Sequence, residues 1–156
     1  MLEIRFADKN DMAELMRIRL EMLREVNSLP EDHVFSDVLV NSSQKYFESG
    51  NDATVLAIED GRAVACASMS FFEIMPTYDH PTGKRAHLMN VYTAPSHRRQ
   101  GIARKMVEML IALAENRGIT EISLDATESG RPLYENLGFG ANSEAMNMIL
   151  MDFKHD

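Results

Sequence analysis

The sequence is poor in the residues that build disulfide frameworks, membrane spans and nucleic-acid interfaces. Its 156 residues include one cysteine, Cys66, so no internal disulfide can form. No apolar run approaches the roughly 20 residues that cross a bilayer. Lys and Arg number 16 against 24 Asp and Glu, a net charge of −8, whereas general nucleic-acid binders need a basic surface. We therefore expect a cytoplasmic protein without a nucleic-acid or membrane partner, with Cys66 packed in its core.

The length suits a single domain over residues 1–156, with one hydrophobic core. Hydrophobic periodicity and turn residues predict the order β-α-α-β-β-β-α-β-α-β, which is an α/β domain built on one mixed sheet. The strands are expected at 2–6, 54–58, 63–72, 86–93, 121–126 and 144–153. The helices are expected at about 11–26, 32–48, 101–116 and 129–137. The front half of the sheet should be antiparallel, and the long helix over 101–116 should join two parallel strands.

The first two helices carry different amounts of apolar surface. The first has an apolar stripe formed by Met12, Leu15, Met16, Leu20, Leu23 and Val26. The second is weaker, and its expected apolar contacts are Val34, Val38 and Phe47.

A basic turn joins the strand over 86–93 to the helix over 101–116. It contains His97, Arg98 and Arg99, and Gly101 opens the helix. The first amides of a helix have no intrahelical acceptor, and the helix dipole adds partial positive charge there. Further cations at this end oppose the dipole, and an anionic ligand would relieve that conflict. The turn therefore indicates a phosphate or pyrophosphate site.

Two segments together resemble the GNAT superfamily of acetyl-CoA-dependent N-acetyltransferases. Arg98-Arg99-Gln100-Gly101-Ile102-Ala103 matches the family's cofactor turn, which is Arg or Gln, two residues, Gly, one residue, and Gly or Ala. Downstream, Leu133-Tyr134-Glu135-Asn136-Leu137-Gly138-Phe139 is similar to the family's second signature. A short glycine pattern alone is weak, but the two in this order are specific.

The resemblance implies acetyl-CoA as co-substrate and no metal. Backbone amides of the turn would hold the cofactor pyrophosphate, and Gly101 would let the backbone approach it closely. The side chains of Arg98 and Arg99 would reach phosphates. Main-chain groups near Val91 and Tyr92 would pair with the pantetheine arm. The turn residues implied in cofactor binding are Arg98, Arg99, Gln100, Gly101, Ile102 and Ala103.

The resemblance also implies an enzyme that moves an acetyl group from acetyl-CoA to an amine of a small molecule or protein. Tyr134 matches the family tyrosine that protonates the departing coenzyme A thiolate. A structural role for Tyr134, as a contact between a helix and the core, is the alternative. At the level of function, the alternative is a non-catalytic acyl-CoA-binding sensor with the same fold.

The general base and the acceptor stay open at this stage. The candidates near the expected cleft are Glu73, His87, Asn90, Asp125 and Glu128, of which Asn90 can hold a water or the amine but cannot accept its proton. Loss of the proton through a water chain, with no dedicated residue, is a further alternative. Acidic residues in the acceptor region, which are Glu25, Glu31, Asp32, Glu73 and Asp79, slightly favour a cationic amine. A homodimer is compatible with the sequence.

Overall fold

The computed structural model of the chain describes residues 1–142 and 144–153. The chain divides into two compact units, Met1–Asp125 and Ala126–Asp156. Among the described residues, the first unit holds five strands and three of the α-helices, and the second holds α4 (Arg131–Asn136).

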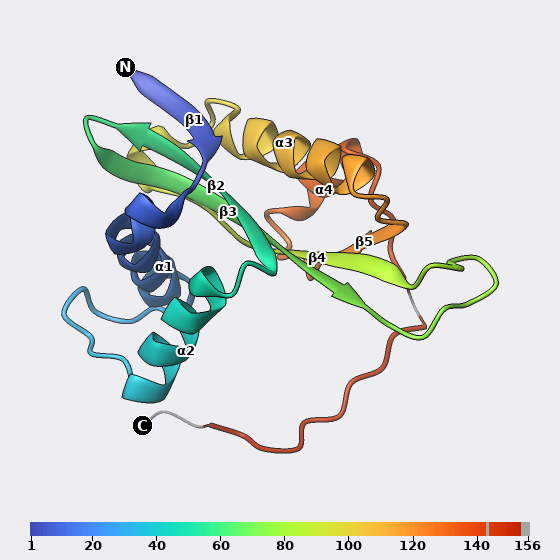
Figure 1. Cartoon of the computed structure of the whole chain (residues 1–156). Coiled ribbons are helices and arrows are strands. Elements are labelled where there is room, and N and C mark those ends of the chain that lie inside the picture. The colour runs from blue at the N-terminus through green and yellow to red at the C-terminus, as the bar shows by residue number, and fades with distance from the viewer. Residues whose placement is uncertain (143, 154–156) are drawn as a thin grey trace. The chain divides into compact units, whose positions relative to one another are not determined.

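The first unit is built on one five-stranded sheet (Figure 1). Its strands, in both chain and spatial order, are β1 (Leu2–Phe6), β2 (Asp52–Glu59), β3 (Arg62–Glu73), β4 (Lys84–Thr93) and β5 (Glu121–Ser123). The first three pairings are antiparallel and the β4–β5 pairing is parallel. This confirms the expected mixed sheet, with its parallel step after the basic turn.

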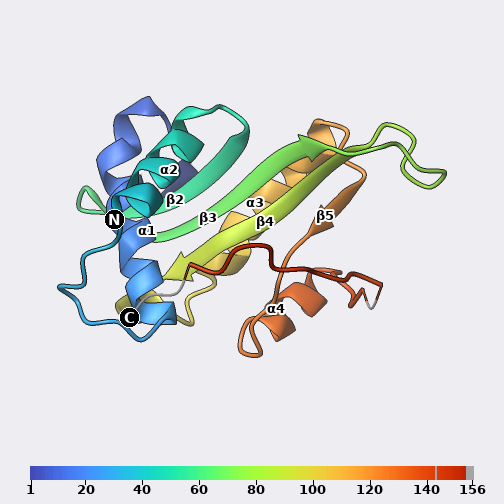
Figure 2. The ribbon, with the colours of Figure 1, turned by 90° about the horizontal axis from the view of Figure 1, so that it is seen from below.

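Helices cover both faces of this sheet. In the view from below, α1 (Met12–Val26) and α2 (Asp37–Glu48) lie on the near side of the strands, while α3 (Ile102–Asn116) lies behind them (Figure 2). Leu15, Ile18 and Met22 of α1 pack with Leu56 and Tyr92 of the sheet. On the other face, α3 contacts β2, β3 and β4 and buries the residues Ile102, Met106, Val107, Leu110 and Ala114.

The buried face of α1 differs from the expected stripe. Ile18 is fully buried although it lies outside that stripe, whereas Val26 is 61% exposed. The spacing Leu15, Ile18 and Met22 makes a narrow seam one residue wide at each turn. The face is narrow because the sheet touches only one side of the helix.

The helix α2 begins later than expected, at Asp37 instead of residue 32. The Oγ of Ser36 accepts a hydrogen bond from the Leu39 amide (3.2 Å), and this cap fixes the start of the helix. Val34 and Val38 are largely exposed, so their expected apolar contacts are wrong. Phe47 does pack against the core, as expected.

The expected last strand over 144–153 is absent from the described residues of that segment. Its apolar side chains are exposed, and they are Met146, Met148, Ile149, Leu150, Met151 and Phe153. A strand is stable only when a neighbour satisfies its backbone groups, and no described strand pairs with this segment. Apolar composition alone therefore gave a wrong prediction here.

Cys66 is fully buried on β3 and packs in the core, as expected. Burial raises the pKa of its thiol to about 12. Within the described residues, no helix combines the length and the apolar character that a bilayer crossing requires.

An ion pair joins the first strand to the start of α1. The guanidinium of Arg5 donates to both carboxylate oxygens of Asp11 (2.8 and 2.9 Å), and the amide of Asp8 donates to the same carboxylate (2.8 Å). The Asp11 side chain is 11% exposed. The hydrogen bonds from Arg5 hold the pKa of Asp11 below its ordinary value.

Asp11→Asn should lower the free energy of unfolding at pH 7 by about 1 kcal/mol, because a charge-assisted pair with a partly exposed arginine is lost. A carboxyl whose pKa is lowered by folding stabilises the fold above its unfolded pKa, about 3.9, and this contribution disappears as the pH falls through the folded pKa. Urea unfolding of both proteins at pH 7, 5 and 3 should therefore show a difference that shrinks with acidification.

Glu3→Gln is the matched control, because Glu3 pairs with the same arginine but is 65% exposed. Its effect should stay below about 0.5 kcal/mol. Equal effects of the two substitutions, or a difference that grows in acid, would contradict this assignment of the Arg5–Asp11 pair.

Candidate functional site

A β-bulge in β4 marks the centre of the site. Cys66 lies opposite Tyr92 and Ser68 lies opposite Met89, so two residues of β4, Asn90 and Val91, oppose one residue of β3. Asn90 has a φ of 58°, which is rare for a residue other than glycine. The carbonyl of Asn90 accepts a hydrogen bond from the Cys66 thiol (3.3 Å). Bulges of this kind re-aim side chains and end regular pairing.

After His87, β4 has a free edge that continues through the bulge. Its parallel partner β5 pairs only with the three residues 85–87. No other described strand lies on that side of β4. Alternate backbone groups of the following residues, through Val91 and Thr93, therefore have no strand partner there. Such an edge accepts an extended polar chain through main-chain hydrogen bonds.

The free edge leads into the basic turn and α3. The chain passes through a short 3-10 turn, Pro95–His97, and then Arg99 and Gly101 adopt φ values of 63° and 77°. Gly101 is the N-cap of α3, and no side chain caps the helix. A Cβ at Gly101 would meet nothing within 4 Å. The first turn of α3 therefore presents uncapped amides to open space, which fits an anionic group such as pyrophosphate.

The two arginines of the turn, Arg98 and Arg99, make different contacts. The Nε of Arg98 donates to the Thr93 carbonyl (2.8 Å), and its guanidinium pairs with Glu25 and lies over the Tyr92 ring. Arg98 thus ties the turn to α1 and does not extend freely from it. Arg99 is exposed and forms no ion pair with other described residues, so it is the arginine of the turn that is free to meet a phosphate.

Among the residues implied in cofactor binding, some have side chains that are buried and so cannot contact a ligand. The Tyr92 ring is buried, and its hydroxyl donates to Glu21 of α1 (3.0 Å). Burial and the nearby Glu21 carboxylate raise the pKa of Tyr92. The Ile102 side chain is also in the core, whereas Gln100 is exposed. Because its ring is buried, Tyr92 can offer a ligand its backbone, and the cofactor role of Val91 and Tyr92 stays a prediction.

Tyr134 lies on the short helix α4 in the second unit. Its ring is half-buried and meets the ring of Phe139 edge to face, with centroids 6.0 Å apart. Burial raises the pKa of its phenol. Its role as the acid stays a prediction.

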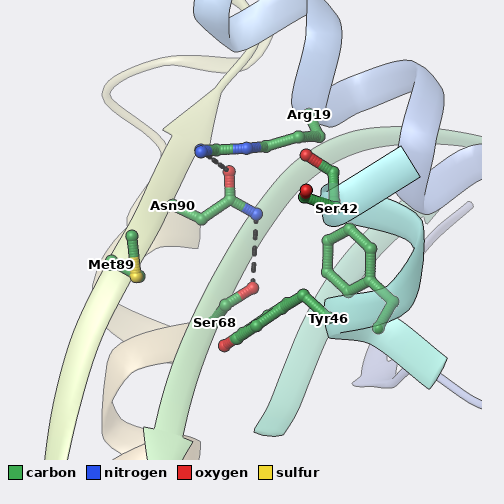
Figure 3. Close-up of a pocket in the computed structure, with 8 residues that line it drawn as sticks. Arg19, Ser42, Tyr46, Ser68, Met89 and Asn90 are labelled. Carbon is green, nitrogen blue, oxygen red and sulfur yellow. Dashed lines mark hydrogen bonds between the residues drawn. The ribbon is translucent and has the colours of Figure 1, made fainter. Parts of the chain in front are cut away.

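A cavity of about 220 Å³ opens between the α1–α2 pair and the strands β3 and β4 (Figure 3). It is lined by Arg19, Ser42, Ser43, Tyr46, Phe47, Ser68, Met89 and Asn90. The guanidinium of Arg19 donates to Asn90 Oδ1 (3.1 Å), and Asn90 Nδ2 donates to Ser68 Oγ (3.2 Å). The bulge thus places the Asn90 side chain in this cavity.

None of the four candidates for the base is among the residues that line the cavity, whereas Asn90, the candidate for holding a water or the amine, does line the cavity. His87 contacts Ser123 (Nδ1 to Oγ, 2.7 Å) and faces Asp125 (3.8 Å). Glu73 and Glu128 are exposed. Among the residues that the structure describes, no cluster of three or more His, Cys, Asp or Glu could hold a metal ion.

Four polar residues that line the cavity stand in no sequence pattern that indicated a site, and they are Arg19, Ser42, Tyr46 and Ser68. One signal was available for Arg19, because it lies four residues after Leu15 and three before Met22, at the border of the buried seam. An arginine there must reach a polar partner or a ligand. For Ser42, Tyr46 and Ser68, no feature of the sequence indicated a role in the cavity.

Comparison with known proteins gives consistent matches. The model of the acetyltransferase (GNAT) family matches residues 14–139. A glucosamine 6-phosphate N-acetyltransferase of Trypanosoma brucei brucei is 27% identical over 151 residues, which cover 96% of each chain. The crystal structure of a predicted acetyltransferase with acetyl-CoA from Clostridium acetobutylicum is 30% identical, with a TM-score of 0.85 over 96% of this chain and 97% of that one.

A second solved structure, a GCN5-related N-acetyltransferase from Ralstonia eutropha, is 27% identical with a TM-score of 0.74 over 96% of this chain and 99% of that one. These relatives match over nearly their whole length, so the similarity includes both the basic turn and the segment around Tyr134.

Gly101→Val should weaken acetyl-CoA binding by about 100-fold or more, because a branched side chain fills the space in front of the α3 amides. The variant should still fold, since a Cβ at this position meets no atom within 4 Å and the main cost is the strain of a positive φ, about 1–2 kcal/mol. Isothermal titration calorimetry measures the affinity, and circular dichroism checks the fold.

Gly118→Val is the matched control. Gly118 has a φ of 74°, it also has open space around its Cβ position, and it lies at the other end of α3. Both variants should lose similar stability, and only Gly101→Val should lose affinity. Unchanged affinity in Gly101→Val would show that this helix terminus holds no phosphate.

Proposed function

Because the chain belongs to the acetyltransferase (GNAT) family, we propose that it transfers the acetyl group of acetyl-CoA to the amine of a small molecule by direct attack of the amine on the thioester. The observation that carries this proposal is the continuity of three features in the first unit. The free edge of β4 leads to the uncapped start of α3, and the cavity around Asn90 opens beside the same bulge.

The free edge of β4 and the start of α3 would bind different parts of acetyl-CoA. Backbone groups at Val91 and Tyr92 would bind the amides of the pantetheine arm as a neighbouring strand would. Amides from Arg99 to Ala103 would hold the pyrophosphate, and the exposed Arg99 side chain would add a charge. This arrangement uses the groups that the fold leaves without partners.

The size of the cavity supports a small molecule as the acceptor. About 220 Å³ accommodates a compact metabolite. The relative from Trypanosoma brucei brucei is named for glucosamine 6-phosphate, which is an amino sugar phosphate of this size class. We therefore favour a compact amine over a protein N-terminus.

In the reaction, the neutral amine attacks the thioester carbon, the carbon–sulfur bond breaks, and the sulfur gains a proton while the amine loses one. Tyr134 is the proposed acid that protonates the sulfur. A phenol has an ordinary pKa of about 10, and burial raises that of Tyr134 further. It therefore stays protonated at neutral pH and can donate as the thiolate forms.

A panel of compact amines, assayed for thiol release from acetyl-CoA, tests the function. Turnover that needs both acetyl-CoA and an amine, with N-acetylated product found by mass spectrometry, is the expected result. Tight acetyl-CoA binding without turnover of any amine would overturn the proposal and favour an acyl-CoA sensor.

Tyr134→Phe should lower kcat by about 100-fold and change KM little, because the ring still packs against Phe139 while the proton donor is lost. Steady-state kinetics with the best amine of the panel gives both constants. Tyr78→Phe is the matched control, since Tyr78 is fully exposed in the loop between β3 and β4. Wild-type kcat in Tyr134→Phe would remove this phenol from the mechanism.

A further inference from the structure

Arg19 carries a positive charge that no carboxylate among residues 1–142 and 144–153 balances. It comes from α1 and lines the cavity, where its one side-chain hydrogen bond to another described residue goes to Asn90 Oδ1 (3.1 Å). No Asp or Glu among the described residues lies within ion-pair distance of it. Arg17, two residues earlier on the same helix, pairs with both Glu14 and Glu21.

The surroundings make this charge costly. Burial lowers the pKa of the Arg19 guanidinium, and the groups that oppose this shift are the Cys66 thiol and the Tyr46 phenol, neither of which is a carboxylate. A charge that is half removed from water and has no counter-ion destabilises the fold. Such a residue is usually paired, so its presence at a cavity wall indicates a partner that comes from outside the chain.

Asn90 holds the guanidinium in place. Its amide oxygen accepts from Arg19, and its amide nitrogen donates to Ser68 Oγ. Ser68 Oγ in turn contacts Thr54 Oγ1 (2.8 Å), which donates to Asp52 (3.1 Å). This chain of hydrogen bonds fixes the Asn90 amide, so that Arg19 Nη1 is anchored while the guanidinium keeps donors for a ligand.

The rest of the lining favours an anion as well. Ser42 and Ser43 of α2 add hydroxyl groups, and Ser42 lies on the Arg19 side of the cavity (Figure 3). Phe47 and Met89 are apolar, and no carboxylate belongs to the lining. Acidic residues of the wider acceptor region suggested a cationic amine, but Glu25 is paired with Arg98 and lines no part of this cavity.

We propose that the amine acetylated by this protein also carries an anionic group, a phosphate or a carboxylate, which binds in the cavity against Arg19 and the serines of α2. The inference rests on the proposed acetyl transfer and adds the chemical class of the acceptor. A planar guanidinium fork suits both oxyanions. The bulge at Asn90 and Val91 places this anion site beside the strand edge where the thioester would lie.

The test compares amines that differ only in the anion. Glucosamine 6-phosphate is paired with glucosamine, and an amino acid is paired with its amide. For the wild-type protein, kcat/KM should be about 100-fold higher for at least one anionic member of these pairs. A preference for the phosphate or for the carboxylate member identifies which oxyanion the cavity takes.

Arg19→Gln should remove that preference by raising KM about 100-fold for the anionic amine, whereas KM for the neutral amine of each pair should change by less than about 5-fold and the affinity for acetyl-CoA should stay unchanged. The variant should remain folded, because it removes an unbalanced charge and keeps a side chain that can donate to Asn90. Arg19→Lys should recover part of the preference, since it restores the charge but not the fork.

Arg24→Gln is the matched control. It removes the same charge from the same helix, but Arg24 contacts the His33 carbonyl and the Phe35 ring outside the cavity. It should keep the wild-type preference. Turnover of neutral and anionic amines at equal kcat/KM, unchanged in Arg19→Gln, would overturn the anion site and leave acetyl transfer standing. Absence of all turnover would overturn the proposed function itself.

Discussion

One extra residue in β4 organises the first unit. Because Asn90 and Val91 together oppose a single residue of β3, the strand turns at this point and Asn90 takes a positive φ. Its side chain then enters the cavity, and its carbonyl meets the buried Cys66 thiol. A regular strand would have placed these groups elsewhere and would have continued the sheet without interruption. The position of the Asn90 side chain in the cavity depends on this irregularity.

The helix α1 connects the two sides of that bulge. It supplies Arg19 to the cavity, while its next turns supply Glu21 to the Tyr92 hydroxyl and Glu25 to Arg98 of the basic turn. The helix α1 thus contacts both the wall of the cavity and the segment that leads to α3. The elements that we assign to donor and acceptor are therefore fixed to the same helix, which keeps their spacing constant.

Local patterns predicted the strands of the sheet, the helix over 101–116 and its start at Gly101, because alternation, apolar periodicity and glycine act over a few residues. Local patterns failed where the structure depends on contacts between residues far apart in the sequence. The segment 144–153 is apolar, but without a neighbouring strand it forms none. Arg19 and Asn90 are 71 residues apart, so their hydrogen bond follows from the packing of α1 on the sheet and from no local pattern.

The burial of Cys66 has a practical consequence for work on this protein. The chain contains no other thiol, and this one is fully buried with a pKa of about 12. A thiolate is the species that reacts with disulfide reagents and maleimides. The folded protein should therefore react very slowly with these reagents. Coenzyme A can therefore be followed continuously with a colorimetric thiol reagent without a background from the protein, and a surface cysteine introduced anywhere on the chain can be labelled at that single position.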